Sequence, residues 1–286
     1  LITQSWGGWV WDVARSWTIG ALIAGAGAAL AVVLMHRFGR RWWMPASALV
    51  VAFAVTITSV APVVLDPIFN KFTPVRDAQT RQDVLELARE AGVDVGEVLV
   101  MDASRRTTAA NAYVAGLGRT KRVVLYDTLL EDFTREEVRL VVAHELAHVH
   151  YTDVPKGLLW VALVAPIGMF AVAVGTRRLA PYGGDVDPSA AIPALALSLA
   201  ILMPLVTTVS NQLSRRVEAR ADSYALQLTG APRPFIGFER RIAIKNVSDP
   251  DPPAWQTSLL ATHPSTIERI GLGVAYERGQ RASSGR

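Results

Sequence analysis

Residues 134–176 read TREEVRLVVAHELAHVHYTDVPKGLLWVALVAPIGMFAVAVGT, and they join a polar helix to an apolar segment. Thr134 and Glu137 have the spacing of a capping box, in which a hydroxyl and a carboxylate three residues later bind the first backbone amides of a helix. This signal predicts a helix that runs to about His150. Gly157–Thr176 then carries no charge and has the length of about 20 residues that a helix needs to cross a bilayer. The stretch therefore predicts a polar helix that leads almost directly into a membrane span.

Three further windows without charge have the length of a membrane span, namely Ser16–Met35, Trp42–Leu65 and Pro188–Ser214. Only 19% of the 286 residues are charged, against about a quarter in a typical soluble domain. Tryptophans lie at the edges of the first two windows, and their amphipathic rings favour the headgroup region of a bilayer. A buried core helix is the alternative for any single window, but four windows together favour an integral membrane protein.

The polar stretch between the second and third windows has the pattern of a small α+β domain. We predict an irregular segment at Asp66–Thr73, then a helix that Gly92 stops. The predicted elements after the irregular segment are a helix at Asp77–Ala91, strands at Glu97–Asp102, Asn111–Ala115 and Arg122–Tyr126, a hairpin loop at residues 116–120 and a short helix at Thr128–Asp132.

The helix that begins at Thr134 carries a metal-binding pattern. His144 and His148 are four residues apart, so both imidazoles lie on one face of the helix and can reach the same ion. Glu145 points to the side where a metal-bound water would lie; a metal lowers the pKa of such a water towards about 7, and a nearby carboxylate takes its proton. The chain has no cysteine, so any metal site must use His, Asp or Glu. The alternative is a helix face that is merely polar.

A third ligand separates the classes of zinc protease. The metzincin pattern requires Gly and His where this chain has Tyr151 and Val154, and His150 faces away from His148. Glu218, beyond the last apolar window, is the candidate ligand, and Asp222 lies one turn later on the same face. Because a metal-bound histidine usually donates its other N–H to a carboxylate, Asp222 is the candidate for that role. Without the two histidines, this segment would read as a solvated charged helix.

The order of the segments predicts how these ligands meet. An even number of spans separates the two polar stretches, so both lie on the same membrane face. We predict an α-helical membrane protein with a small α+β zincin-like catalytic domain that a transmembrane hairpin splits. The expected segments are 1–65 with two spans, 66–156 with the first half of the domain, 157–212 with the hairpin and 213–286 with the second half. Three protein ligands leave a fourth position for water, which predicts one catalytic Zn²⁺ per chain.

At this point the sequence resembles a known family, the type I CAAX prenyl proteases, which are integral-membrane zinc endopeptidases of the gluzincin type. The resemblance covers residues 65–269 and rests on several blocks in the same order. These blocks are Leu65–Phe72, Ser104–Gly116 with Asn111-Ala112-Tyr113, Arg122–Leu130, His144–His148, Asn211–Asp222 and Thr262–Ser265.

The resemblance implies a role for each matching residue. It implies zinc on His144, His148 and Glu218, Glu145 as general base, Asp222 as the residue that orients a ligand, Asn111 as a holder of the substrate backbone and His263 as a stabiliser of the transition state. An exposed edge strand beside Asn111 would suit this, because an extended peptide can add to such an edge. From the residues alone, Asn111 also fits a turn residue, and His263 fits a loop histidine that Pro264 holds extended.

One departure from the family leaves alternatives open. The family typically has seven spans and this sequence has four, so we expect a member that lacks its N-terminal spans. Arginine far outnumbers lysine, and alanine and valine are abundant, so we expect a bacterial member. The four-span count also suits heat-shock membrane metalloproteases of the HtpX type, which clear damaged membrane proteins. A third reading is a membrane scaffold with a vestigial zinc site, although a scaffold needs neither Glu145 nor an open coordination position.

The expected partners are a peptide or protein substrate, either membrane-associated or of the CAAX type, and the lipid bilayer. The chain has a net charge of +4, but its basic residues are scattered rather than gathered on one helix, so we expect no nucleic acid. Basic residues near the span ends lean towards a cytoplasmic catalytic face under the positive-inside rule. We therefore expect a multi-pass protein of the bacterial plasma membrane.

Overall fold

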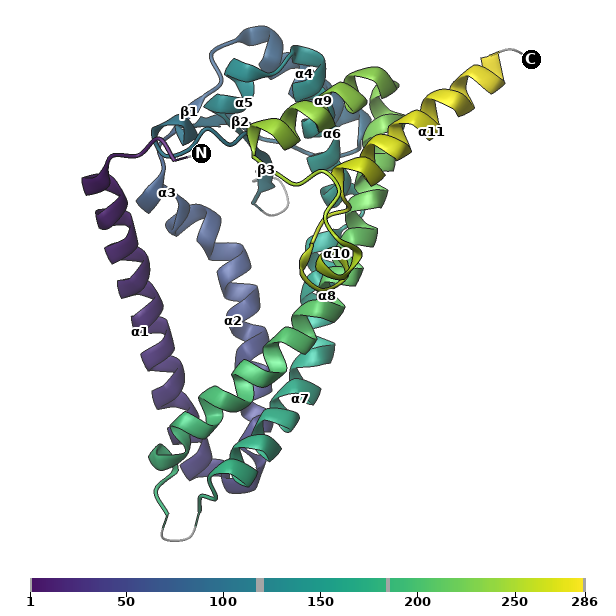
Figure 1. Cartoon of the computed structure of the whole chain (residues 1–286). Helices are drawn as coiled ribbons and strands as arrows, with labels where there is room; N and C mark the ends of the chain where they lie inside the picture. Colours follow the sequence, from purple (N-terminus) through teal and green to yellow (C-terminus); the bar gives the residue numbers. More distant parts are fainter. Residues whose placement is uncertain (1, 117–120, 184–185, 285–286) are drawn as a thin grey trace. The chain divides into compact units, whose positions relative to one another are not determined.

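The computed structural model describes residues 2–116, 121–183 and 186–284 (Figure 1). The chain divides into two compact units. The sheet unit comprises residues 1–4, 59–154 and 211–286, and the membrane unit comprises residues 5–58 and 155–210. Most of the predicted hairpin loop, residues 117–120, lies outside the described residues. The segment boundaries expected from the sequence remain predictions.

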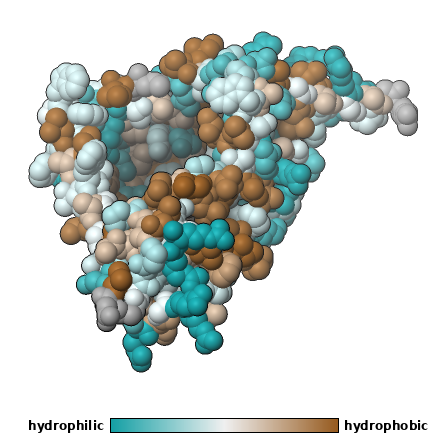
Figure 2. Space-filling view, turned by 60° about the horizontal axis from the view of Figure 1, so that its bottom comes forward, coloured by the Kyte–Doolittle hydropathy of each residue, from teal (hydrophilic) through white to brown (hydrophobic). Residues whose placement is uncertain are grey.

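Within the described residues, four helices are long and apolar enough to cross a membrane, and each overlaps one of the predicted windows. They are α1 (Trp6–Phe38), α2 (Trp43–Val64), α7 (Asp153–Leu179) and α8 (Ile192–Thr229). Large apolar side chains on these helices are exposed, among them Leu22, Ile167 and Leu205. The space-filling view accordingly has broad hydrophobic areas (Figure 2). The predicted class, a helical membrane protein with a small sheet-containing domain, is confirmed.

Trp42 in the membrane unit differs from the expectation of a headgroup residue. Its side chain is 1% exposed and packs with Met35 and Val172. The indole Nε1 donates a hydrogen bond to the Tyr182 hydroxyl at 2.5 Å. A buried tryptophan needs such a partner for its N–H, which the sequence pattern did not reveal.

The sheet unit carries the remaining major elements. Before the hairpin these are α3 (Asp66–Phe69), β1 (Phe72–Pro74), α4 (Ala78–Glu90), β2 (Glu97–Met101), β3 (Ala112–Ala115), β4 (Arg122–Tyr126), α5 (Asp127–Asp132) and α6 (Arg135–His150). After it come α9 (Pro232–Lys245), α10 (Ala254–Leu260) and α11 (Thr266–Ser284).

Within the described residues, the sheet has the strand order β1-β2-β4-β3. β2 and β4 are parallel, whereas β3 and β4 form the predicted antiparallel hairpin, and β3 lies at an edge. The irregular segment expected at Asp66–Thr73 is wrong. Pro67 opens the single turn of α3, and Phe72–Pro74 pairs antiparallel with β2. β1 is too short for its pairing to show as an alternating pattern in the sequence.

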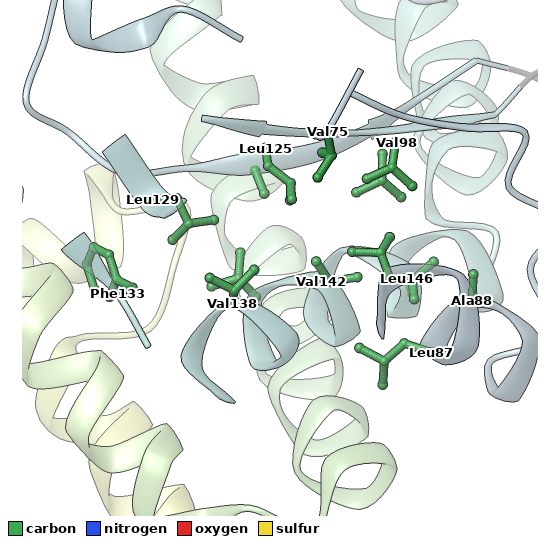
Figure 3. Packing of buried hydrophobic residues seen from close by; sticks show 14 of the residues in the cluster. Val75, Leu87, Ala88, Val98, Leu125, Leu129, Phe133, Val138, Val142 and Leu146 are labelled. Carbon is green, nitrogen blue, oxygen red and sulfur yellow. The ribbon is translucent and has the colours of Figure 1, made fainter. Parts of the chain in front are cut away.

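The core of the sheet unit fixes the orientation of α6. Val138, Val142 and Leu146 lie at successive i, i+4 positions and pack towards Leu125 of β4 (Figure 3). Leu87 of α4 packs in the same cluster. Because this face of α6 packs in the core, His144 and His148 lie on another face of the helix.

Local signals act as predicted at Thr134 and Gly92, and the structure has a second capping pair at the start of α11. Thr134 and Glu137 form both hydrogen bonds of the capping box. Ser265 and Glu268 form a second reciprocal pair at the start of α11, with distances of 2.7 and 3.2 Å. Gly92 has a φ of 68°, the left-handed conformation expected after α4.

Candidate metal centre

Three side chains converge on one point of the sheet unit. His144 and His148 of α6 have their Nε2 atoms 3.3 Å apart. Glu218 of α8 places its Oε2 atom 3.2 Å from Nε2 of His144 and its Oε1 atom 3.7 Å from Nε2 of His148. The trio forms a group whose donor atoms all lie within 4.8 Å of one another.

These separations fit a zinc ion. Zinc binds histidine nitrogen and carboxylate oxygen at about 2.0–2.2 Å in a tetrahedral arrangement, so its ligand atoms are about 3.3 Å apart. The donor set is two imidazoles and one carboxylate, which suits zinc, and it leaves one tetrahedral position open. The residues present therefore fit a catalytic rather than a structural zinc site.

His144 is held by a buried chain of charges. Its Nδ1 donates to Oδ1 of Asp222 at 2.9 Å, and Asp222 is fully buried. Arg269 of α11 donates two hydrogen bonds to the same carboxylate, of 2.6 and 2.7 Å. Arg269 also pairs with Glu239 of α9 at 2.9 Å. The carboxylate that orients His144 is thus itself fixed from two further helices.

His148 has a different partner. Its Nδ1 lies 3.1 Å from Oδ2 of Asp153, the first residue of α7. Arg220 of α8 forms an ion pair with the other oxygen of Asp153. Sequence reasoning assigned a carboxylate to only one of the two histidines.

The electrostatics of the site favour a cation. Burial disfavours the charged form of His144, but hydrogen bonds to Asp222 and Glu218 prevail and raise its pKa to about 10. The same carboxylates would stabilise a positive ion between the rings and Glu218. Burial raises the pKa of Glu145, while the neighbouring His144 and His148 oppose the shift. A carboxylate with a raised pKa is a stronger base for a water proton.

One cavity joins the candidate catalytic residues. It has a volume of about 670 Å³, and its lining includes Glu145, Asn111 and His263. Nε2 of His263 lies 3.2 Å from Oε2 of Glu218, so the imidazole stands beside the ligand cluster. The Thr262 hydroxyl lies 2.8 Å from Nδ1 of His263 and can donate to it, which leaves the ring proton on Nε2.

Asn111 directly precedes the edge strand β3. The Asn111 carbonyl accepts a hydrogen bond from the Tyr126 amide, so its backbone faces β4. Backbone groups alternate along a strand, and those of Ala112 and Val114 therefore face the open edge. The Asn111 side-chain oxygen accepts from the Ala112 amide at 2.9 Å, which places the side chain on that edge.

Two of the sequence blocks behind the resemblance are joined in space. The Tyr113 hydroxyl of β3 donates to Asp66 at 3.0 Å. Arg106 donates to the side-chain oxygen of Asn70 at 2.6 Å. The segment around α3 thus holds the edge strand and the turn before it in place through these two hydrogen bonds.

Every predicted site residue lies around this centre. They come from α6, α8, the residue before β3 and the α10–α11 loop, and they are His144, His148, Glu218, Glu145, Asp222, Asn111 and His263. Sequence reasoning missed Asp153, Arg220, Glu239 and Arg269. Asp153 follows His148 by five residues. Because α6 ends at His150, this spacing does not predict that the two side chains meet. Arg269 lies in the first turn of α11, four residues after Ser265.

Known proteins share these features. Residues 74–272 match the model of peptidase family M48, and residues 2–71 match a model described as the CAAX prenyl protease N-terminal region with five membrane helices. An uncharacterized metalloprotease of Bacillus subtilis, YhfN, is 32% identical over 94% of this chain and 65% of its own length. A probable CAAX prenyl protease 1 of Schizosaccharomyces pombe is 29% identical over 91% of this chain and 56% of its own. The chain thus spans less than two thirds of these relatives.

The fold has a solved counterpart. The crystal structure of S. mikatae Ste24p superposes with a TM-score of 0.83 at 24% sequence identity. The match covers 95% of this chain and 68% of that chain. At this identity the likeness establishes a shared fold.

Proposed function

Because the chain belongs to peptidase family M48, we propose that it is a membrane-embedded, zinc-dependent endopeptidase. The observation that carries the proposal is the convergence of His144, His148 and Glu218 at the spacing of a tetrahedral ion, beside a cavity that Glu145 lines. His144, His148 and Glu218 would hold one Zn²⁺. When bound, the ion would acidify a water molecule and polarise the carbonyl of the scissile peptide bond.

Glu145 is the proposed general base. It follows a ligand directly on α6 and lines the cavity, so its carboxylate is within reach of a water molecule beside the ligand trio. It takes the water proton and later delivers it to the leaving amine. Burial raises the pKa of Glu145, which strengthens it for the first of these steps.

Asn111 and the edge of β3 are the proposed substrate platform. An extended peptide can add to a strand whose outer N–H and C=O groups are unpaired. The Ala112 carbonyl and the backbone groups of Val114 face this edge, while the Ala112 amide is bound by the Asn111 side chain. The amide group of Asn111 would donate to a peptide carbonyl. This arrangement holds the peptide by its main chain and leaves side-chain selection to the cavity walls.

His263 is the proposed donor to the transition state. With its proton on Nε2, the ring presents an N–H next to Glu218, where negative charge develops on the carbonyl oxygen during hydrolysis. Such preplaced donors act mainly in the transition state. Asp222 would keep His144 oriented by accepting the proton of Nδ1.

The proposed substrates are membrane-associated proteins, including those of the CAAX type. Several relatives bear the name CAAX prenyl protease 1, which favours this class over the HtpX-type alternative. We place the protein in a bacterial plasma membrane with its catalytic face towards the cytoplasm.

A cleavage assay tests the proposal. The purified protein in detergent is incubated separately with a prenylated CAAX peptide, with the same peptide lacking the prenyl group, and with casein. We expect cleavage that chelation abolishes and Zn²⁺ restores, with faster turnover of the prenylated peptide. Preference for unfolded casein over both peptides would support the quality-control alternative. Cleavage that survives complete metal removal, or none of any substrate with zinc bound, would contradict the proposal.

A further inference from the structure

The two metal-binding histidines have separate supports, and only the support of His144 was foreseen. His148 contacts Asp153, whose side chain is 11% exposed, and Asp153 in turn pairs with Arg220. We propose that Asp153, held by Arg220, is the positioning residue for His148. This inference rests on the proposed zinc site and concerns how the second imidazole is oriented within it.

The geometry around His148 gives Asp153 a defined task. Nε2 of His148 points to His144 and Glu218, so this nitrogen must carry the lone pair that binds a metal. The ring proton then lies on Nδ1, where Oδ2 of Asp153 accepts it at 3.1 Å. A carboxylate at this place fixes both the tautomer and the angle of the ring, and it makes the other nitrogen a better ligand.

The chain reaches this position through an unfavourable turn. Thr152, which follows the end of α6, has a φ of 55°. A β-branched residue in the left-handed region is strained and persists only where the surroundings hold it. The turn brings the first residue of α7 back onto the last turns of α6. The contact between Asp153 and His148 is the result of this reversal.

Arg220 holds Asp153 and is itself fixed. Its guanidinium lies 4.3 Å from the centre of the Tyr151 ring. Tyr151 is two residues before Asp153. Arg220 also follows the ligand Glu218 by two residues on α8. The ion pair therefore links the start of α7 to the part of α8 that supplies a ligand. A clasp that only joined the two helices would leave zinc binding by His148 unaffected, whereas a support for Asp153 acts on His148.

The first test measures the zinc affinity of the purified chain by competition with a chromophoric chelator. Asp153→Asn keeps the size of the side chain but removes its charge, and we expect zinc affinity to fall about 10–100-fold. Arg220→Gln should lower affinity by a smaller factor, since Asp153 stays but is no longer held. Glu277→Gln removes the acidic partner of Arg233 and Arg281 away from the site, and it should leave affinity unchanged.

A charge exchange separates positioning from clasping. The double variant Asp153→Arg with Arg220→Asp retains opposite charges at the two positions but places a cation next to His148. We expect its thermal unfolding temperature to recover towards wild type, while its zinc affinity remains low. Recovery of zinc affinity in the exchange variant, or wild-type affinity in Asp153→Asn, would overturn the inference. Failure of the wild-type chain to bind one zinc would instead contradict the proposed function, so the two failures are distinguishable.

Discussion

Replacing His263 with alanine removes the side chain that stands beside the ligand cluster without being one of its three members. Nε2 of His263 contacts Glu218, and the loop that carries it is fixed by Pro264 and by the capping pair of Ser265 and Glu268. A rigid loop of this kind aims the imidazole at a fixed point. We expect His263→Ala to bind zinc normally and to fold normally, but to turn over substrate slowly.

The magnitude follows from the exposure of the ring. A buried oxyanion donor contributes about 10²–10³-fold to kcat. The His263 side chain is 59% exposed, and solvent weakens electrostatic stabilisation, so the lower end of that range applies. We therefore expect kcat to fall about 10²-fold, equivalent to about 2.7 kcal/mol of transition-state stabilisation.

Steady-state kinetics on a quenched-fluorescence peptide measure this effect. Loss of a group that acts only in the transition state lowers kcat and kcat/KM together. An unchanged kcat with a raised KM would refute the reasoning and assign His263 to ground-state binding. Loss of zinc from the variant would also refute the reasoning, because it would show that His263 is a metal ligand.

The remaining predictions concern the ligands, the edge strand and the core. Glu218→Ala should lose zinc on dialysis against a weak chelator, whereas Asp222→Ala should weaken binding by about 10–100-fold; full zinc occupancy in Glu218→Ala would contradict the ligand assignment. Asn111→Ala should raise KM for peptides by about 10-fold without changing zinc content, because one hydrogen bond is worth about 1 kcal/mol or somewhat more; an unchanged KM would remove it from the substrate platform. Asp83→Asn should destabilise the protein by about 1–2 kcal/mol, because Arg135 and Arg139 pair with this carboxylate. The hydrogen bond from Arg135 lowers the pKa of Asp83, so this contribution is present above the unfolded pKa of about 3.9 and is lost as the pH falls further. The difference in unfolding temperature between this variant and wild type should shrink as the pH falls from about 3.9 towards the lowered pKa of Asp83 in the folded protein, and a difference that stays constant over this range would contradict the assignment.

Local signals account for most of what the sequence predicted. The capping box at Thr134, the four-residue spacing of His144 and His148 and the charge-free windows are properties of adjacent residues, and each appears in the structure as expected. Glu218 required one further step, the continuity of a span into the ligand helix. The structure has that continuity, since α8 runs unbroken from Ile192 to Thr229.

Long-range pairings account for what was missed. β1 is three residues long, and only its partner β2 makes it a strand. Arg269 is separated from Asp222 by 47 residues, and nothing in either segment marks their contact. Asp153 depends on a reversal at Thr152, a conformation that β-branched residues seldom adopt. Such features arise from tertiary packing, which a single sequence does not encode in any local pattern.

The central claim is that Glu145 acts on water at a zinc ion held by His144, His148 and Glu218. Measuring zinc content and peptide hydrolysis of Glu145→Gln beside wild type tests it most directly. The account predicts one zinc per chain in both proteins and a loss of hydrolysis of about 10²–10⁴-fold in the variant, because the amide cannot take the water proton. Wild-type hydrolysis by a zinc-loaded Glu145→Gln, or a wild-type chain that binds no zinc, would contradict it.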